Sequence, residues 1–361
     1  MEECLKRALP NHSDEERNLI KRLFRLRPKK TSKNLTPRDM KRFINRICAL
    51  HKQWCGSVPL KFQALYALYE DEINDEKLIE GKFTNQETFS KVLNVLGEDR
   101  EEWRRYLAAL YFNVPPERAI HVLIGNRVEG ALSGGNKEEL RKLTEIVGIW
   151  EVVEDVLDRM DLREHPEQIG LACLALSDAP DAPNRLFLHL SGMLLRSIRN
   201  WDKLDERSCE GLVTLSKRLE GRRGEEIVGH LLDSLAKTKP PEETTVDWVK
   251  GVLKIVKRAK EIGLEEKLKE FRVEGDASDY LRVLRALAMV IEDALPFSEY
   301  FAPKINGKEV LQDLSSKIIS EGTEKLGDMV RCLLKVPKFS ELAEGEWQSL
   351  VEAIRQKLDN Q

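Results

Sequence analysis

The stretch Thr36-Pro37-Arg38-Asp39-Met40-Lys41-Arg42-Phe43-Ile44-Asn45-Arg46-Ile47-Cys48-Ala49-Leu50 has the pattern of an amphipathic α-helix. Thr36 suits the N-cap, Pro37 the first helical position and Asp39 the first turn. The apolar residues then recur at helical spacing, as Met40, Phe43, Ile44, Ile47 and Leu50. Helical periodicity recurs along the whole chain, whereas sustained alternation of apolar and polar residues does not. The sequence therefore predicts an all-α fold.

Helices are expected on both sides of this stretch. In the first half they should begin near residues 14, 59, 86, 98, 115, 136 and 148, after capping residues, glycines or prolines. Later segments are expected at 166–177, 183–199, 205–220, 223–238, 243–262, 277–295, 308–335 and 340–358. Helices of this length joined by short turns stack as an α-solenoid or an irregular superhelix. The predicted architecture is a multi-helical N-terminal bundle followed by an irregular α-solenoid-like array.

The chain length predicts more than one packed unit. It has 361 residues, more than the roughly 250–300 that a single core usually serves. We predict a basic helical bundle at 1–58, a middle helical domain at 59–163 and a solenoid-like C-terminal array at 164–361. Tryptophans recur about every 49 residues from Trp54 to Trp248, but their flanking residues differ, so a true repeat requires the rings to occupy equivalent places in their helices.

The charge is unevenly distributed. The whole chain has a net charge of −3, whereas residues 17–46 contain twelve Lys or Arg and one acid, a local charge of +11. The remaining residues therefore sum to −14. Because so many cations repel one another, an anion is expected to bind this segment. The expected anion-binding or nucleic-acid-binding residues are Arg17, Lys21, Arg25, Lys29, Lys30, Lys33, Arg38, Lys41, Arg42 and Arg46; a merely solvated basic face is the alternative.

The sequence lacks the common catalytic motifs. It has no Gly-x-x-x-x-Gly-Lys-Ser/Thr, no Gly-x-Gly-x-x-Gly and no Gly-x-Ser-x-Gly. The six histidines are never closer than 24 residues, so no helix can present a histidine pair to a metal. No apolar run is long enough to span a membrane, and six scattered cysteines without a Cys-x-x-Cys suit reduced thiols in the cytoplasm. We expect no enzyme activity, cofactor, metal or membrane span, and a cytoplasmic location.

Residues Leu35 to Asn45 resemble a known signature. They match Thr/Asn-Pro-Arg-x-x-Lys-x-Phe-x-Asn, which follows the ATPase core in KAP-type P-loop NTPases. Leu5 to Pro10 resembles the short helix before the lid of those proteins, and Leu50 to Trp54 with Pro59 to Tyr66 resembles its continuation in large bacterial members. The resemblance covers roughly residues 1–160 and implies that the N-terminal bundle is lid-like.

The resemblance implies a role for three residues. In such NTPases the arginine after the proline lies on a lid that closes over the nucleotide, so Arg38 would read the terminal phosphate, with Lys41 and Arg42 as auxiliary contacts. The chain begins where the nucleotide-binding core would have ended, so these contacts require a core joined to it or encoded separately. Bacterial relatives of this kind include phage-exclusion proteins, which implies a defence-type system.

Two functions of different classes follow. The first is a noncatalytic regulatory or protein-interaction module that resembles the region after the KAP-type ATPase core and binds a protein partner. The second is a nucleic-acid-binding helical protein that uses the basic 17–46 element, with salt-dependent affinity. An enzyme whose site is assembled from distant helices is a third possibility.

Overall fold

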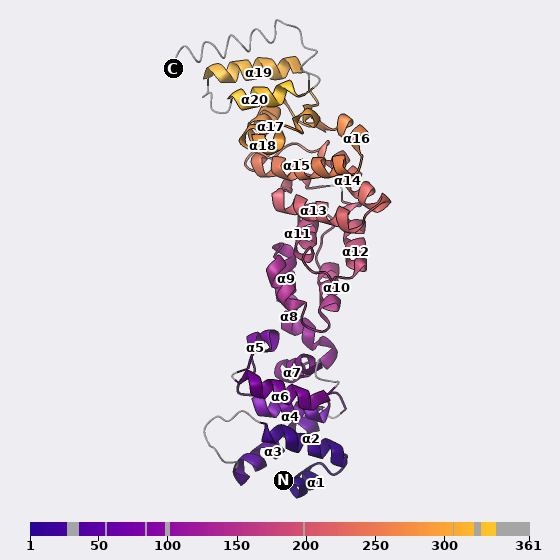
Figure 1. Cartoon of the computed structure of the whole chain (residues 1–361), viewed down its shortest axis with the longest axis vertical. Helices are drawn as coiled ribbons and strands as arrows, with labels where there is room; N and C mark the ends of the chain where they lie inside the picture. Colours follow the sequence, from indigo (N-terminus) through magenta and orange to yellow (C-terminus); the bar gives the residue numbers. More distant parts are fainter. Residues whose placement is uncertain are drawn as a thin grey trace. The chain divides into compact units, whose positions relative to one another are not determined.

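The computed structural model describes residues 1–26, 36–54, 56–83, 85–97, 102–197, 199–305, 307–320 and 326–336. Within them the protein is all-α, as predicted (Figure 1). The helices up to residue 160 are α1 (Glu2–Ala8), α2 (Asp14–Arg25), α3 (Pro37–Trp54), α4 (Leu60–Tyr69), α5 (Asp75–Glu80), α6 (Gln86–Leu96), α7 (Trp103–Phe112), α8 (Pro116–Ser133), α9 (Lys137–Leu143) and α10 (Ile149–Arg159).

The later elements are also mostly helical. They are α11 (Pro166–Leu176), α12 (Asn184–Leu194), η2 (Trp201–Lys203), α13 (Glu206–Arg218), α14 (Arg222–Leu235), α15 (Thr245–Glu261), α16 (Glu265–Glu270), α17 (Ala277–Met289), α18 (Ile291–Ala294), η3 (Ser298–Tyr300), α19 (Gly307–Ser320) and α20 (Leu326–Leu334). Two short strands, β1 (Arg272–Val273) and β2 (Ala302–Pro303), pair in parallel. The sequence did not indicate α5, α16 or these strands. The helix expected at 308–335 corresponds to α19 and α20, and the one expected at 340–358 lies outside the described residues.

The chain forms two compact units. The first comprises residues 1–129 and 141–156, and the second comprises 130–140 and 157–361. The boundary expected at 58 falls inside the first unit, where α3 packs on α4. Separate folding of residues 1–58 stays a prediction. None of the helices in the described ranges is long and apolar enough to cross a membrane.

An aromatic cluster organises the first unit. Phe89 of α6 lies with its ring centroid 5.3 Å from Tyr69 of α4 and 5.1 Å from Trp103 of α7, and Phe83 stands 4.3 Å from Phe89. All four rings are buried. Aromatic pairs at these separations add to the hydrophobic stabilisation of a core. The cluster therefore fixes α4, α6 and α7 together and gives α3 a rigid support through α4.

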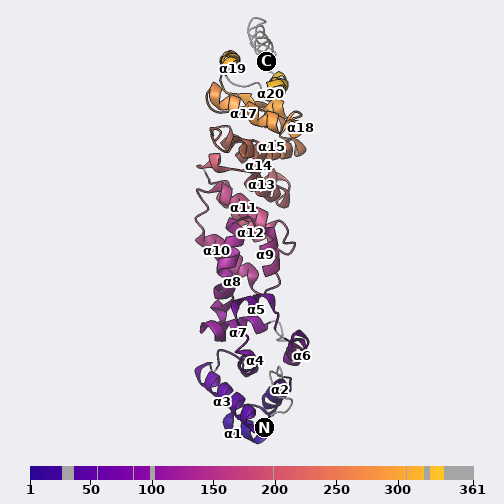
Figure 2. The ribbon, with the colours of Figure 1, turned by 90° about the vertical axis from the view of Figure 1, so that its left-hand side faces the viewer.

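The second unit is a two-layered helical array. Helices α11, α13, α15 and α17 pack successively side by side, and α12, α14 and α16 contact them from a second layer. The succession of α13, α15 and α17 is visible in two perpendicular views (Figure 1 and Figure 2). Each repeat of the array contains one helix from each layer, which agrees with the predicted solenoid-like arrangement.

Glycines set the spacing of the first layer. A Cβ on Gly211 of α13 would lie 1.8 Å from the carbonyl oxygen of Gly170 in α11, and a Cβ on Gly170 would lie 2.2 Å from the carbonyl oxygen of Ser208. In α15, a Cβ on Gly251 would lie 2.7 Å from the carbonyl oxygen of Asp205. Only glycine permits backbones to approach this closely. These glycines recur 41 and 40 residues apart, and each helix places one at its interface.

The tryptophan spacing does not mark a repeat. Trp54 ends α3, Trp103 begins α7 and Trp201 lies in the 3-10 turn η2. Because these places are not equivalent, the 49-residue repeat is wrong. The period of this array is near 40 residues, and its markers are the interface glycines.

Replacement of Gly211 by Ala is expected to destabilise the second unit strongly. The new methyl group would collide with the Gly170 backbone, so α11 and α13 would have to separate, at a cost of about 3 kcal/mol in the free energy of unfolding. Chemical denaturation of the full chain measures this. Gly130→Ala is the matched control, since no atom lies within 4 Å of the added Cβ, and it should be neutral or stabilising by up to about 1 kcal/mol. Equal effects of the two substitutions would contradict the packing argument.

Candidate functional site

Helix α3 begins with the cap that its sequence predicts. The backbone N–H of Asp39 donates to the Thr36 hydroxyl at 3.2 Å, and the Asp39 carboxylate accepts from the Thr36 hydroxyl at 2.8 Å and from its N–H at 3.3 Å. This reciprocal arrangement satisfies backbone donors that a helix start otherwise leaves open. The cap therefore fixes where α3 begins and places Arg38 in its first turn.

The two faces of α3 differ as the periodicity predicts. Phe43, Ile44, Ile47 and Leu50 are buried, whereas the opposite side is exposed to solvent. The exposed polar side chains of this side are Arg38, Lys41, Arg42, Asn45 and Arg46. Cationic side chains therefore line one face of α3, and the opposite face packs into the core.

The end of α2 adds two more cations. Phe24 stacks on Phe43 of α3, with ring centroids 4.8 Å apart, so the last turn of α2 adjoins the first half of α3. Arg22 and Arg25 belong to that last turn and are exposed. The chain positions these cations through buried aromatic packing.

Three of the predicted anion-binding residues already have acidic partners within the fold. Arg17, whose side chain is only 12% exposed, donates to the Leu9 carbonyl at 3.0 Å and pairs with Asp14 at 2.9 Å. Lys21 lies 3.4 Å from the Glu2 carboxylate. Arg46 makes a two-point ion pair with Glu70 at the end of α4, one bond of which measures 2.8 Å. These residues link α1, α2, α3 and α4, and are poorly placed to bind a further anion.

The other predicted residues divide into two groups. Lys29, Lys30 and Lys33 lie outside the described residues. Within the described part of the chain, Arg25, Arg38, Lys41 and Arg42 are exposed and have no acidic partner, and the same holds for Arg22, which was not among the predicted residues. We call these five cations, at the end of α2 and in the first two turns of α3, the cationic face. Lys52, in the last turn of α3, is also exposed without an acidic partner and is not counted with them. Arginine remains charged at any physiological pH, and its planar donors suit phosphate and carboxylate oxygens. The cationic face can bind an anion without breaking an ion pair of the described fold.

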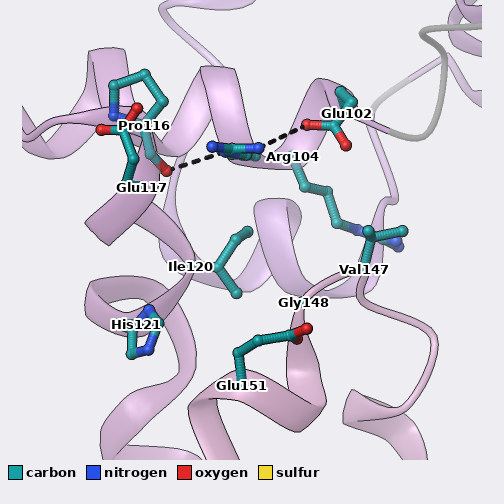
Figure 3. A pocket seen from close by; sticks show the side chains of 10 residues that line it. Glu102, Arg104, Pro116, Glu117, Ile120, His121, Val147, Gly148 and Glu151 are labelled. Atoms are coloured by element: carbon teal, nitrogen blue, oxygen red, sulfur yellow. Dashed lines mark hydrogen bonds and ion pairs between the residues drawn. The ribbon is translucent and has the colours of Figure 1, made fainter. Parts of the chain in front are cut away.

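The first unit also contains a cavity of about 350 Å³. It is lined by the first turns of α7, α8 and α10 (Figure 3). Its arginine donors are already used: Arg105 donates to Glu102 and to the Pro116 carbonyl, both at 3.2 Å, and Arg104 donates to the carbonyls of Leu78 and Glu145. His121 Nε2 lies 2.7 Å from the Asp155 carboxylate, without the alignment of a hydrogen bond. The polar groups of this cavity therefore stabilise the fold.

The three buried cysteines offer little nucleophilic chemistry. Burial raises the pKa of the Cys173 and Cys209 thiols far above the usual value, and that of Cys332 to about 11. A thiol reacts as its thiolate, so these three are inert near neutral pH. The described residues also contain no group of three or more His, Cys, Asp or Glu side chains that could hold a metal ion.

Comparison of the chain with known protein families, with curated proteins and with solved structures finds no match.

Replacement of Thr36 by Ala is expected to loosen the start of α3. The substitution removes the acceptor of the Asp39 N–H and a donor to the Asp39 carboxylate, which costs about 1 kcal/mol. Native-state hydrogen exchange should show faster exchange in the first turn of α3 and little change in its last turns. Thr36→Ser retains the hydroxyl and should preserve protection; equal fraying in both variants would exclude a capping role for the hydroxyl.

Proposed function

We propose that this chain is a noncatalytic helical binding protein whose cationic face engages an anionic partner. The supporting observation is the difference among its N-terminal cations: Arg17, Lys21 and Arg46 have acidic partners, whereas the five residues of the cationic face have none in the described chain. Pairing would have been easy to encode, because elsewhere exposed cations such as Lys91 sit beside a carboxylate. Like charges gathered on one surface favour an anion there.

The form of this function that we favour is a regulatory module of a KAP-type NTPase. The resemblance of residues 35–45 supports it, and so does the exposed first-turn position of Arg38 beside Lys41 and Arg42. In this proposal a P-loop core, joined to the chain or assembled with it, supplies the phosphates, and Arg38 contacts the terminal one. The helical array of the second unit then binds a protein partner, as extended helical arrays do. Leu188 on α12 is 52% exposed and is a candidate contact.

Hydrolysis assays test the absence of a catalytic centre. The full chain is expected to show no ATP turnover above a buffer blank with Mg²⁺ present. Turnover by the chain alone that co-elutes with the protein would contradict the proposal. Its loss in Arg38→Gln would assign the turnover to this chain, because a contaminating enzyme would not respond to that substitution.

Nucleic acid is the second candidate partner, and the number of free cations favours it. Five cations on one surface are enough to neutralise several backbone phosphates. If each contacts one phosphate of duplex DNA, the slope of log K against log salt should be about −4.5. Stacking side chains are missing from the exposed positions of α3, so contacts would be to the backbone and largely independent of base sequence.

The combined variant R38Q/K41Q/R42Q separates these possibilities. Anisotropy of a labelled 20-base-pair duplex, measured between 50 and 200 mM salt, should give a slope near about −4.5 for the native chain and about −1.8 for the variant. The matched control K6Q/K82Q/K91Q removes three exposed cations of the same unit that are paired with acids, and it should retain the native slope. If the native chain does not bind at 50 mM salt, nucleic acid is excluded. Inorganic tripolyphosphate binding that only R38Q/K41Q/R42Q loses would favour the nucleotide form.

A further inference from the structure

Two histidines far apart in the sequence meet inside the first unit. His12 lies in the connection between α1 and α2, and His51 lies in the last turn of α3. Their Nε2 atoms are 3.2 Å apart, and the rings meet edge to face. At this distance a proton must sit between the two nitrogens, because two lone pairs or two N–H groups would repel each other.

The outer nitrogen of His12 faces a carboxylate. Its Nδ1 lies 3.2 Å from Glu16 Oε2. The Ser13 N–H donates to the same oxygen at 3.0 Å, which closes the capping box of α2. That bond lowers the pKa of Glu16, so Glu16 is ionised and accepts only. His12 must therefore carry a proton on Nδ1.

An amide acts on the ring of His51: Gln63 of α4 is among the groups that shift its pKa. The outer nitrogen of His51, Nδ1, is buried without a hydrogen bond, and so is Oε1 of the fully buried Gln63. The Gln63 amide is fixed, since its Nε2 donates to the Val58 carbonyl at 2.7 Å. Burial and the charge of His12 lower the pKa of His51, and a smaller effect of Gln63 raises it. Gln63 therefore acts on His51 as a hydrogen-bond acceptor would. A proton on His51 Nδ1, donated to Gln63 Oε1, would satisfy both orphaned atoms.

Counting protons then selects one state. With one extra proton shared by the pair, four groups form an unbroken chain: Glu16 accepts from His12, His12 donates to His51, and His51 donates to Gln63. With no extra proton, the pair carries two ring protons for three bonds, so one bond is lost. With two extra protons, both rings are cations with N–H groups directed at each other. The singly protonated pair alone satisfies every polar atom of the cluster.

We propose that His12 and His51 form a single-proton clasp, which closes the α1–α2 connection onto α3 and opens when a second proton binds. Around the pair, the groups acting on His51 are His12 and Glu16, which are ionisable, and Gln63, which is neutral. The thiol of Cys48, one turn earlier on α3, donates to the Ala8 carbonyl oxygen of α1, with 3.8 Å between the sulfur and the oxygen. The clasp does not depend on which partner the cationic face binds.

The direction of the pH dependence follows from His51. Burial, and then the charge of His12, lower its pKa below the ordinary 6.5. In the unfolded chain this ring takes up its proton near pH 6.5, whereas the folded chain resists it. The unfolded state therefore binds more protons than the folded pair as the pH falls below 6.5, and the stability that the clasp contributes while it holds one extra proton is progressively lost. Opening would expose Leu5 of α1 and Leu9 of the connection after it, which are both buried in the closed state.

Hydrogen exchange of the full chain at pH 7.5 and pH 5.5 tests the clasp. After correction for the intrinsic exchange rate, amides of α1 should lose protection by at least about tenfold at the lower pH, the equivalent of one pKa unit. His51→Gln removes the titrating ring but keeps a hydrogen-bonding group, and should abolish this loss. His12→Gln serves the same purpose if the first variant folds poorly. The control His189→Gln removes an exposed histidine that pairs with Asp158 in the second unit, and should leave the loss intact.

Imidazole nitrogen NMR supplies an independent readout. At pH 7 we expect Nδ1 of His51 to be protonated and one proton to be shared between the two Nε2 atoms. An unprotonated His51 Nδ1 would overturn the proposal, and so would equal α1 protection at both pH values in the native chain. A metal between the rings would also overturn it. In that case Zn²⁺ would raise, and EDTA would lower, the protection of α1 at pH 7.5, whereas the single-proton clasp predicts no effect of either.

Discussion

The close contact between the backbones of Gly170 and Gly211 is the constraint on which the second unit depends. The carbonyl oxygen of Gly170 occupies the volume that a side chain on Gly211 would need, so α11 and α13 meet without intervening side chains. Gly251 repeats the arrangement between α13 and α15. Ion pairs beside these contacts add specificity: Glu210, next to Gly211, accepts from Lys254 of α15 at 2.8 Å and from Lys137 at 3.5 Å. These partly exposed ion pairs contribute less free energy than the packing does. The close backbone contact therefore determines the distance between the helices, and the ion pairs favour one alignment of the helices along their axes.

The first unit depends more on how its charges are distributed. The +11 of residues 17–46 overstates the free charge of the surface, because Glu2, Asp14 and Glu70 neutralise three of these cations. None of those acids lies in the basic segment itself. The folded chain brings acids from α1, the start of α2 and the end of α4 to these cations and leaves the first half of α3 without such partners. A net charge counted along the sequence cannot show this difference, which depends on long-range contacts.

Local signals in the sequence were sufficient for most of the helices and for the caps at Ser13 and Thr36, but they did not indicate the short helices α5 and α16. The capping boxes at Ser13 and Thr36 involve residues three apart, and the buried stripe of α3 follows from its period alone. The interface glycines were not predicted, although Gly-Leu-x-x-Leu at 170 and 211 was available as a signal. The regular spacing of the tryptophans corresponds to no structural equivalence, because the rings lie at different places in their helices. His12 and His51, separated by 39 residues, could not be paired, because α1 must pack on both α2 and α3 before the two rings meet.

The cationic face and the histidine clasp share α3, which raises the question of whether they influence each other. Arg42 and His51 are nine residues apart, a rise of about 14 Å along a helix. The Debye length at physiological ionic strength is only about 8 Å, so an anion bound at Arg42 changes the proton affinity of His51 little through charge alone. A substantial linkage would have to pass through the packing of α1 against α3. It would then be reciprocal, because an anion that favours the open clasp must be bound more tightly when the second proton has opened the clasp.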